Sequence, residues 1–424
     1  MPAMKQFIII GNSAAGIAAI EAIRIRDKES RITVISDEDY PAYCRCLISY
    51  YLAAEVKEEK LLYRPDNFYK QNNVELLLNK KAARVDPKKN RVVCEDKSQF
   101  NYDSLLIATG ASPKFPETKG IKKKGVFGFR TIKDAQEIAG LLPVTRSAVV
   151  LGGGLIGLKA AYALKKRNVD VKVIIKSKQV LSQMLDFAAA AFIQRRLEQN
   201  GVDIVSGCDV TEVIGNGDIK AVKLDSGKAF GCSLIVVAKG VMPNTDLIKD
   251  AGININQGIT VNNLMQTNIP NIYAAGDVCE SFDLTLNQPA VNALWPVAVE
   301  QGRAAGMNMS GDSLNYAGSL GMNSIEFFGL PVISLGFYQV KEGDSSFEVL
   351  QLRDDKANVY KKLIIKDGRL YGAVLAGDIK TSGVLLRLIR EKIDLTPFKG
   401  KLLQENFAYP DIMDFIKDKE RVYV

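Results

Sequence analysis

The chain has 424 residues, of which 47% are hydrophobic, and it carries a formal net charge of +8. This length exceeds one ordinary hydrophobic core, so we expect two or three domains. The sequence contains no histidine, which excludes Ser-His-Asp and Cys-His catalysis and imidazole metal sites.

Six cysteines without framework spacing suit a reducing compartment. No apolar run reaches the roughly 18 residues that span a bilayer, and no cleavable leader pattern opens the chain. We therefore expect a cytoplasmic protein without a membrane partner.

Basic residues are spread along the chain, and the densest short cluster is Lys122–Lys124. This pattern indicates either a solvated surface or attraction to an acidic protein partner. No arginine-rich or aromatic-interleaved stripe is present, so we expect no nucleic acid as a partner.

The first motif follows a short apolar run at residues 7–10, which predicts a buried parallel strand. Gly11, Ser13 and Gly16 occupy the positions of a GxGxxG turn, with serine in place of the middle glycine, and an alanine-rich helix follows. Such a turn brings backbone N–H groups to a pyrophosphate. After the second strand, Asp37 lies near the spacing expected for a carboxylate that binds ribose hydroxyls. Taken alone, the turn could also be a tight strand–helix junction.

A second copy of the pattern spans residues 147–175. A strand at residues 149–151 leads into Gly152, Gly154 and Gly157, which match GxGxxG in full, and a helix and a second strand follow. Two such motifs, each in its own βαβ unit, predict two bound dinucleotides. A flavin that exchanges a hydride with a nicotinamide is the chemistry that this pair suggests.

Two further strands end in Ala108-Thr109-Gly110 and in Gly276-Asp277. With the two glycine turns, these endings make residues 4–310 resemble the FAD-dependent pyridine nucleotide-disulfide oxidoreductase superfamily. The resemblance implies that Asp277 binds the ribityl chain of FAD and that Val85 borders the adenine through its backbone. It also implies that a helix starting at Pro296 faces the flavin; Trp295 is either near the ring or a core aromatic.

The full set of residues that we expect to bind cofactors comes from both turns and from these endings. It comprises Gly11, Ser13, Ala14, Ala15, Gly16, Asp37, Glu38, Arg45, Ser49, Val85, Ala108, Thr109, Gly110, Gly152, Gly154, Leu155, Ile156, Gly157, Lys176, Gly240, Gly276, Asp277 and Trp295.

Strands at residues 359–365 and 370–375, joined by a turn, and a helix at residues 382–393 predict an α+β tail. The tail resembles the C-terminal domain of NADH–rubredoxin oxidoreductases and the flavin region of assimilatory nitrite reductases. It also resembles FAD/NAD(P) subunits of anaerobic carbon monoxide or phenylglyoxylate dehydrogenases. The predicted fold class is α/β, with two Rossmann-like domains and this tail. We expect an FAD-binding domain at residues 1–115 and 241–315, an NAD(P)-binding domain at 116–240 and an interface domain at 316–424.

The segment around Cys44 and Cys46 raises the question of a redox thiol. The helix after the first turn lacks the CxxxxC pair that disulfide-using members of the superfamily carry. A disulfide between residues i and i+2 of an extended chain is disfavoured, because their Cα atoms lie about 6.6 Å apart, near the upper limit for a disulfide bridge. The spacing from Cys46 to Tyr50-Tyr51 resembles coenzyme A disulfide reductases and thiol-dependent NADH oxidases. The same stretch equally resembles the nitrite and rubredoxin reductase pattern, in which the residue at Arg45 contacts FAD phosphate. Cys46 is therefore either a catalytic thiol or a small apolar filler. The remaining cysteines are scattered, so no metal site is expected.

At two positions of the expected nicotinamide site, this sequence differs from the pattern of the superfamily. The position that is normally acidic after the second turn is Ile175, followed by Lys176, so both NAD(H) and NADP(H) stay open. Lys159 replaces the glutamate of many relatives and is either a surface lysine or a catalytic cation beside the flavin or nicotinamide.

These observations predict an FAD-dependent NAD(P)H oxidoreductase. Its partner would be a small iron–sulfur carrier of the rubredoxin or ferredoxin type or a dehydrogenase subunit, in either direction of electron flow. The alternatives are a thiol-dependent NADH oxidase or coenzyme A disulfide reductase that uses Cys46, and a structural flavin subunit of a larger complex. Assembly into a homo-oligomer is left open.

Overall fold

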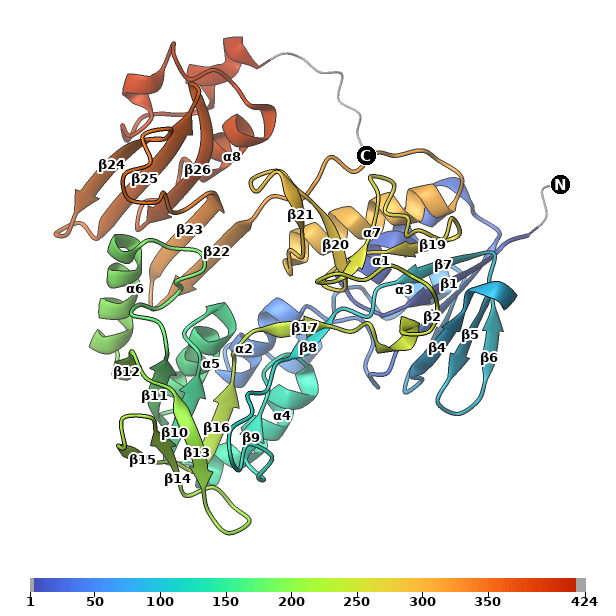
Figure 1. The fold of residues 1–424 in the computed structure, drawn as a ribbon, viewed down its shortest axis with the longest axis horizontal. Coiled ribbons are helices and arrows are strands. Elements are labelled where there is room, and N and C mark those ends of the chain that lie inside the picture. The colour runs from blue at the N-terminus through green and yellow to red at the C-terminus, as the bar shows by residue number, and fades with distance from the viewer. Residues whose placement is uncertain (1–3, 417–424) are drawn as a thin grey trace. The chain divides into compact units, whose positions relative to one another are not determined.

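The computed structural model describes residues 4–416, which divide into two compact units, each described separately below (Figure 1). The first unit contains residues 4–116, Gly128–Pro143 and Lys239–Leu320. The second contains Glu117–Phe127, Val144–Ala238 and residues 321–416. The chain forms two compact units, and this division does not test the boundaries of the three domains that we expected from the sequence. Those boundaries stay a prediction.

The first unit is built on a five-stranded parallel sheet of order β19-β7-β1-β2-β3. Its strands are β1 (Gln6–Ile10), β2 (Arg31–Ile35), β3 (Val74–Leu77), β7 (Ser104–Ile107) and β19 (Ile272–Ala274). The apolar runs of β1 and β7 are buried, as expected for strands covered on both faces. The strand order reverses between β1 and β7, which is where open α/β sheets bind their ligands.

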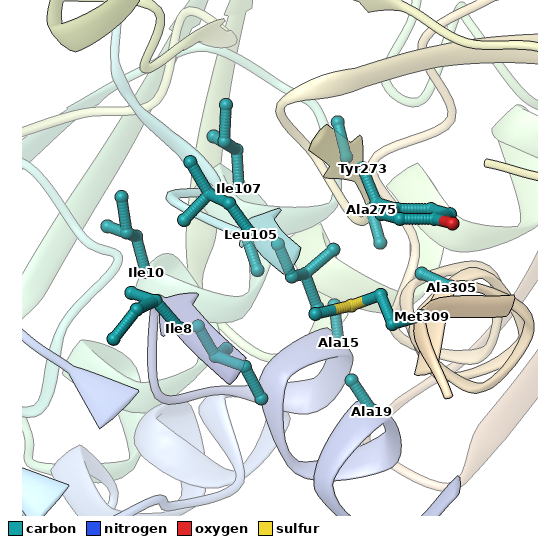
Figure 2. Packing of buried hydrophobic residues seen from close by; sticks show 14 of the residues in the cluster. Ile8, Ile10, Ala15, Ala19, Leu105, Ile107, Tyr273, Ala275, Ala305 and Met309 are labelled. Atoms are coloured by element: carbon teal, nitrogen blue, oxygen red, sulfur yellow. The ribbon is translucent and has the colours of Figure 1, made fainter. Parts of the chain in front are cut away.

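Two helices pack closely together in this unit: α1 (Ala14–Arg26) and α7 (Trp295–Met309). Small residues meet where they approach, because a Cβ on Gly302 would lie 2.2 Å from the Ala15 carbonyl oxygen. A Cβ on Gly306 would likewise lie 2.5 Å from the Ala19 oxygen. Figure 2 shows Ala15 and Ala19 on one helix facing Ala305 and Met309, with Leu105 of the sheet nearby. The start of α1 is therefore held by α7 as well as by the sheet.

Arg24, near the end of α1, is buried and joins three segments. Its guanidinium donates to the carbonyl oxygens of four residues, at 2.6–3.1 Å: Asn72, Asp27, Ser30 and Asn73. Burial lowers the pKa of Arg24 below its usual value, and the nearby Asp27 carboxylate opposes this shift only in part. This side chain fixes the end of α1 against the loops before β2 and β3.

Smaller elements complete the first unit. An antiparallel sheet contains β4 (Ala82–Asp86), β5 (Arg91–Cys94) and β6 (Gln99–Asn101), and another pairs β8 (Ala111–Pro113) with β17 (Val241–Pro243). A third contains β18 (Ile259–Thr260), β20 (Cys279–Asp283) and β21 (Gln288–Ala290). The remaining helices are α2 (Ile48–Leu52), α3 (Phe68–Gln71) and α4 (Ile132–Leu141).

The second unit repeats the same design in a parallel sheet of order β12-β11-β10-β16-β9. Its elements are β9 (Val126–Phe127), β10 (Ser147–Leu151), α5 (Leu155–Lys166), β11 (Asp170–Ile175), α6 (Phe187–Gln199), β12 (Val202–Ser206) and β16 (Leu234–Val237). An antiparallel sheet of β13 (Val210–Ile214), β14 (Ala221–Leu224) and β15 (Ala229–Gly231) follows β12.

The C-terminal part of the second unit is an antiparallel sheet of order β22-β23-β26-β25-β24, with α8 (Ser382–Glu391) packed on β26. Its strands are β22 (Met322–Phe327), β23 (Leu330–Gly336), β24 (Glu348–Asp354), β25 (Val359–Lys366) and β26 (Arg369–Ala376). The two strands and the helix predicted for the tail agree with β25, β26 and α8 to within two residues.

One carboxylate links this sheet to the parallel sheet of the same unit. Asp186 caps α6 by accepting a hydrogen bond from the Ala189 N–H at 3.0 Å. The same carboxylate accepts from the Tyr360 hydroxyl at 2.6 Å and from the Lys362 ammonium at 2.8 Å, both on β25. The Lys362 charge is therefore compensated although its side chain is only 11% exposed.

Candidate functional site

The first glycine turn connects β1 to α1 and has no room for a side chain at Gly11 and Gly16. Gly11 has φ +119°, and a Cβ there would lie 2.0 Å from the Ala108 carbonyl oxygen at the end of β7. A Cβ on Gly16 would lie 2.1 Å from the Gly11 oxygen. Both positions therefore require glycine, and the backbone of the turn lies directly against the predicted Ala108.

The helix that follows starts without a side-chain cap. Ser13 is the N-cap residue of α1 but makes no capping hydrogen bond, and the first turn of α1 contains no acidic residue. By contrast, Thr131 caps α4 with a full capping box, and Asp186 caps α6. The N–H groups near Ala14 and Ala15 thus lack the side-chain oxygen that usually satisfies them. An anion, such as the pyrophosphate of a dinucleotide, fits this end of the helix.

The second turn, between β10 and α5, has the same geometry. Gly152 has φ +117°, and a Cβ on Gly157 would lie 2.0 Å from the Gly152 oxygen. Gly154 is the N-cap residue of α5, which again leaves the helix start without a side-chain cap. Leu155 and Ile156 open the helix, and Ile156 is 47% exposed at this point. The second turn therefore fits a second dinucleotide.

A polar cluster surrounds the first turn. Arg45, in the 3-10 helix η1 (Arg45–Leu47), forms an ion pair with Glu38 and lies with its Nε 3.4 Å from the Ser13 Oγ. Tyr43 donates to the same Glu38 carboxylate at 2.6 Å. The structure thus brings three predicted residues, Ser13, Glu38 and Arg45, together beside the start of α1. Asp37 is exposed.

A second ion pair joins this cluster to the end of β19. Arg130 pairs with the predicted Asp277, and the Arg130 carbonyl accepts from the Arg45 Nη1 at 3.2 Å. Gly276 has φ +80°, and its N–H donates to Oε1 of the buried Gln301 in α7 at 2.8 Å. Sequence reasoning missed Arg130 and Gln301. The stretch Arg130-Thr131 before a helix with Asp134 in its first turn is a capping signal, but it says nothing about Asp277.

One buried polar atom near the first turn lacks a partner. The Asn12 Nδ2 has no hydrogen-bond acceptor among residues 4–416, although its Oδ1 accepts from the Tyr69 hydroxyl at 2.8 Å. A buried unsatisfied amide donor costs free energy, which a bound acceptor would recover. The fit of FAD to this turn therefore rests on the glycine geometry, the uncapped helix and this donor.

The other predicted residues of the first unit lie at several places around the sheet. Thr109 and Gly110 bond to Asn244: the Thr109 hydroxyl donates to the Asn244 carbonyl at 2.8 Å, and the Asn244 N–H donates to the Gly110 carbonyl at 2.9 Å. Gly240, at φ +90°, accepts from the Lys114 N–H at 2.9 Å. Ser49 on α2 and Val85 on β4 are buried. Trp295 is the first residue of α7, one residue before the predicted start, and its ring packs edge-to-face on Tyr63 with centroids 5.0 Å apart.

Cys44 and Cys46 are both free thiols, and they interact with each other. The hydrogen bond from the Cys46 thiol, together with the backbone N–H groups of Cys46 and Leu47, lowers the pKa of Cys44 to about 6. The same hydrogen bond raises the pKa of Cys46 above its usual range. These hydrogen bonds favour a thiolate on Cys44 rather than on Cys46. The two alternatives for Cys46, a catalytic thiol or a small apolar filler, stay predictions.

The two predicted lysines of the second unit have different surroundings. The Lys159 Nζ donates to the Glu326 carbonyl oxygen on β22 at 3.0 Å and lies over the rings of Tyr162 and Phe327. Lys159 is thus in contact with the C-terminal sheet of its own unit. Lys176, directly after β11, is exposed.

Within residues 4–416, no group of three or more cysteine, aspartate or glutamate side chains is arranged to hold a metal ion. No helix in this range has both the length and the apolarity needed to cross a membrane.

Comparison with known proteins adds to this geometry. Residues 5–302 match the family model described as pyridine nucleotide-disulphide oxidoreductase, and residues 322–393 match the rubredoxin NAD+ reductase C-terminal domain. The chain is 32% identical to the NADH-dependent phenylglyoxylate dehydrogenase subunit epsilon of Aromatoleum evansii, over 95% of this chain and 96% of that protein. It is also 32% identical to the assimilatory nitrate reductase electron transfer subunit of Bacillus subtilis, over 96% of this chain. The chain spans only about half of that relative, 52% of its length.

Solved structures share the fold. The structure of an NAD-dependent persulfide reductase from A. fulgidus has a TM-score of 0.87 and 28% sequence identity, covering 96% of this chain and 80% of that one. The predicted fold class is therefore confirmed. The predicted cofactor pair is confirmed as well, because the matched family binds FAD and NAD(P)H. From the two glycine turns, the uncapped helices and these matches, it follows that the chain belongs to the pyridine nucleotide-disulphide oxidoreductase family.

Proposed function

We propose that this protein is an FAD-dependent NAD(P)H oxidoreductase that passes electrons between a nicotinamide and an iron–sulfur or rubredoxin/ferredoxin-type protein. The observation that carries the proposal is a repeated arrangement: a parallel strand, a glycine turn without room for a Cβ, and a helix without a side-chain cap. One copy in each unit provides for two dinucleotides. Bound FAD would supply the hydride and single-electron chemistry that links the nicotinamide to a one-electron carrier.

The residues around the first turn have separate parts in this proposal. The N–H groups at the start of α1 and the Asn12 amide donate to the pyrophosphate of FAD, and Arg45 adds positive charge beside Ser13. Asp277 accepts hydrogen bonds from the ribityl chain, while Arg130 holds its carboxylate in position. These residues bind and orient FAD, so no side-chain nucleophile is required.

The nature of the partner is supported by the C-terminal part of the chain and by its relatives. Residues 322–393 match a domain described by its occurrence in rubredoxin NAD+ reductase. The two relatives described above are named as an electron transfer subunit and as a subunit of a dehydrogenase. The formal net charge of +8 favours an acidic carrier. A cytoplasmic location is part of the same proposal.

An anaerobic titration of the FAD-loaded chain tests this function. NADH or NADPH should bleach the yellow colour, and a rubredoxin or a ferredoxin should then restore it. The Cys46→Ser variant should behave like the unaltered protein. A reconstituted protein that stays colourless, or a flavin that neither nucleotide bleaches, would sink the proposal. Slow bleaching by both nucleotides would favour a structural flavin in a larger complex.

A second candidate function is reduction of a disulfide or persulfide by a protein thiolate. The hydrogen bond between Cys44 and Cys46 favours it, because Cys44 holds its negative charge near neutral pH. This candidate predicts that Cys44→Ser abolishes NAD(P)H-dependent reduction of coenzyme A disulfide but leaves electron transfer to a rubredoxin intact. Equal rates with coenzyme A disulfide in the variant and the unaltered protein would remove it.

A further inference from the structure

The loop after β11 lies beside the second glycine turn. Leu151 and Ile174 are partners in the β10–β11 register, and the Gly152 N–H donates to the Ile174 carbonyl at 3.0 Å. The chain then returns to the turn, because the Leu181 N–H donates to the Gly153 carbonyl at 2.8 Å. Residues 176–180 are therefore held next to the backbone that would bind the pyrophosphate of a dinucleotide.

The strand end offers no carboxylate to a ribose. Ile175 occupies the last position of β11 and is 2% exposed. A Cβ on Gly153 would lie 2.6 Å from the Ile175 Cγ2, so this side chain fills the space under the turn. Ser177 donates through its hydroxyl to the Gln179 carbonyl at 2.7 Å. A carboxylate at this position would bind the adenosine 2′-hydroxyl and repel a 2′-phosphate. Because the strand ends in Ile175, it can do neither.

Two lysines, Lys176 and Lys178, follow Ile175 in the loop after β11. Lys176 and Lys178 are both exposed, and within residues 4–416 neither ammonium has an ion-pair or hydrogen-bond partner. Lys172, on the same strand, differs in that it pairs with Asp203. Lys176 and Lys178 lie in the loop directly after β11, at the end of the sheet where the second glycine turn is located.

We propose that the second glycine turn selects a dinucleotide with a 2′-phosphate on its adenosine ribose, NADP(H), and that Lys176 and Lys178 are the residues that select it. This inference rests on the proposed function, because it names the nucleotide that the second turn binds. A phosphate monoester carries a charge of about −1.5 to −2 at neutral pH. Two ammonium groups within reach of it favour the phosphorylated ribose by roughly tenfold or more, and salt weakens this preference.

The test measures binding of adenosine 2′,5′-bisphosphate and of 5′-AMP to the FAD-loaded chain by calorimetry, so it requires no turnover. The bisphosphate should bind roughly tenfold more tightly, and raising the salt concentration should reduce the difference. The double variant Lys176→Ala/Lys178→Ala should bind both compounds equally. Lys356→Ala is the matched control, because Lys356 is exposed in the turn between β24 and β25 of the same unit and its removal changes the net charge by one at a site outside the loop after β11. This control should keep the tenfold preference.

The outcomes separate this inference from the proposed function. Similar affinity for the two compounds in the unaltered chain, or a preference that survives the double variant, overturns the selection by these lysines. If NADH and NADPH nevertheless bleach the flavin, the oxidoreductase proposal stands. If neither compound binds and neither nucleotide bleaches the flavin, both proposals fall together.

Discussion

Replacing Gly302 with alanine tests the close approach of α1 and α7. The added Cβ would lie 2.2 Å from the Ala15 oxygen and 2.7 Å from the Ala15 Cα, whereas ordinary contact begins at 3.4 Å. The neighbouring atoms belong to the backbone, so the helices must separate by about 1.2 Å to relieve the closer contact. Overpacking of this kind costs about 3 kcal/mol, and the better helix propensity of alanine returns about 1 kcal/mol. We expect Gly302→Ala to lower the free energy of unfolding by about 2 kcal/mol.

The matched control is Gly140→Ala in α4 of the same unit, where a Cβ would meet no atom within 4 Å. Only the propensity term remains there, so this variant should gain about 0.5–1 kcal/mol. Thermal unfolding followed by circular dichroism should separate the two variants by about 3 °C. Equal melting temperatures would refute the close packing of the two helices and, with it, the support that α7 gives to the first glycine turn.

Three further predictions follow from the contacts of single side chains. Arg24→Met leaves four carbonyl oxygens without their donor and should cost at least about 2–3 kcal/mol in urea unfolding, whereas Arg26→Met, which removes an exposed ion pair, should cost about 1 kcal/mol or less. A lowered pKa means that the Cys44 thiolate is lost as the pH falls through about 6, so iodoacetamide labelling of Cys44 should rise up to about pH 7 and then level off. In Cys46→Ala the donor is gone, so this rise should move toward the usual cysteine range near pH 8.5; a labelling profile that does not move contradicts the thiol–thiol hydrogen bond. Arg130→Gln removes the charge partner of Asp277, the carboxylate that we propose to bind the ribityl chain, and should weaken FAD retention on a desalting column about tenfold or more; full retention would contradict the positioning role proposed for Arg130.

The parts of the fold that depend on local patterns were predictable from the sequence. Short apolar runs followed by a glycine turn located β1 and β10, and the alternation of strand and helix predicted both parallel sheets. The glycine positions carried the same information, because Gly11, Gly16 and Gly157 are required by backbone contacts within their own turns or with the adjacent strand.

The contacts of the polar site could not be predicted in this way. Arg130 and Asp277 are 147 residues apart in the sequence, and neither position has a local pattern that names the other. The same holds for Gln301, because no pattern in the sequence of its helix indicates a partner. In the structure its buried side chain accepts a hydrogen bond from the Gly276 N–H. The preference for a thiolate on Cys44 depends on the direction of three hydrogen bonds, which residue spacing does not encode.

The carboxylate of Asp186 has a consequence for how such chains can be recombined. It is shared between the start of α6 and Lys362 on β25, so exchanging the C-terminal sheet with that of a relative moves one half of a buried charge pair. A chimera that retains Asp186 but receives an apolar residue at position 362 would bury a carboxylate without its cation. A chimera that retains Lys362 but receives an apolar residue at position 186 would bury an ammonium without its carboxylate. Domain shuffling in this lineage is therefore expected to carry the two positions together, even though 176 residues separate them in the sequence.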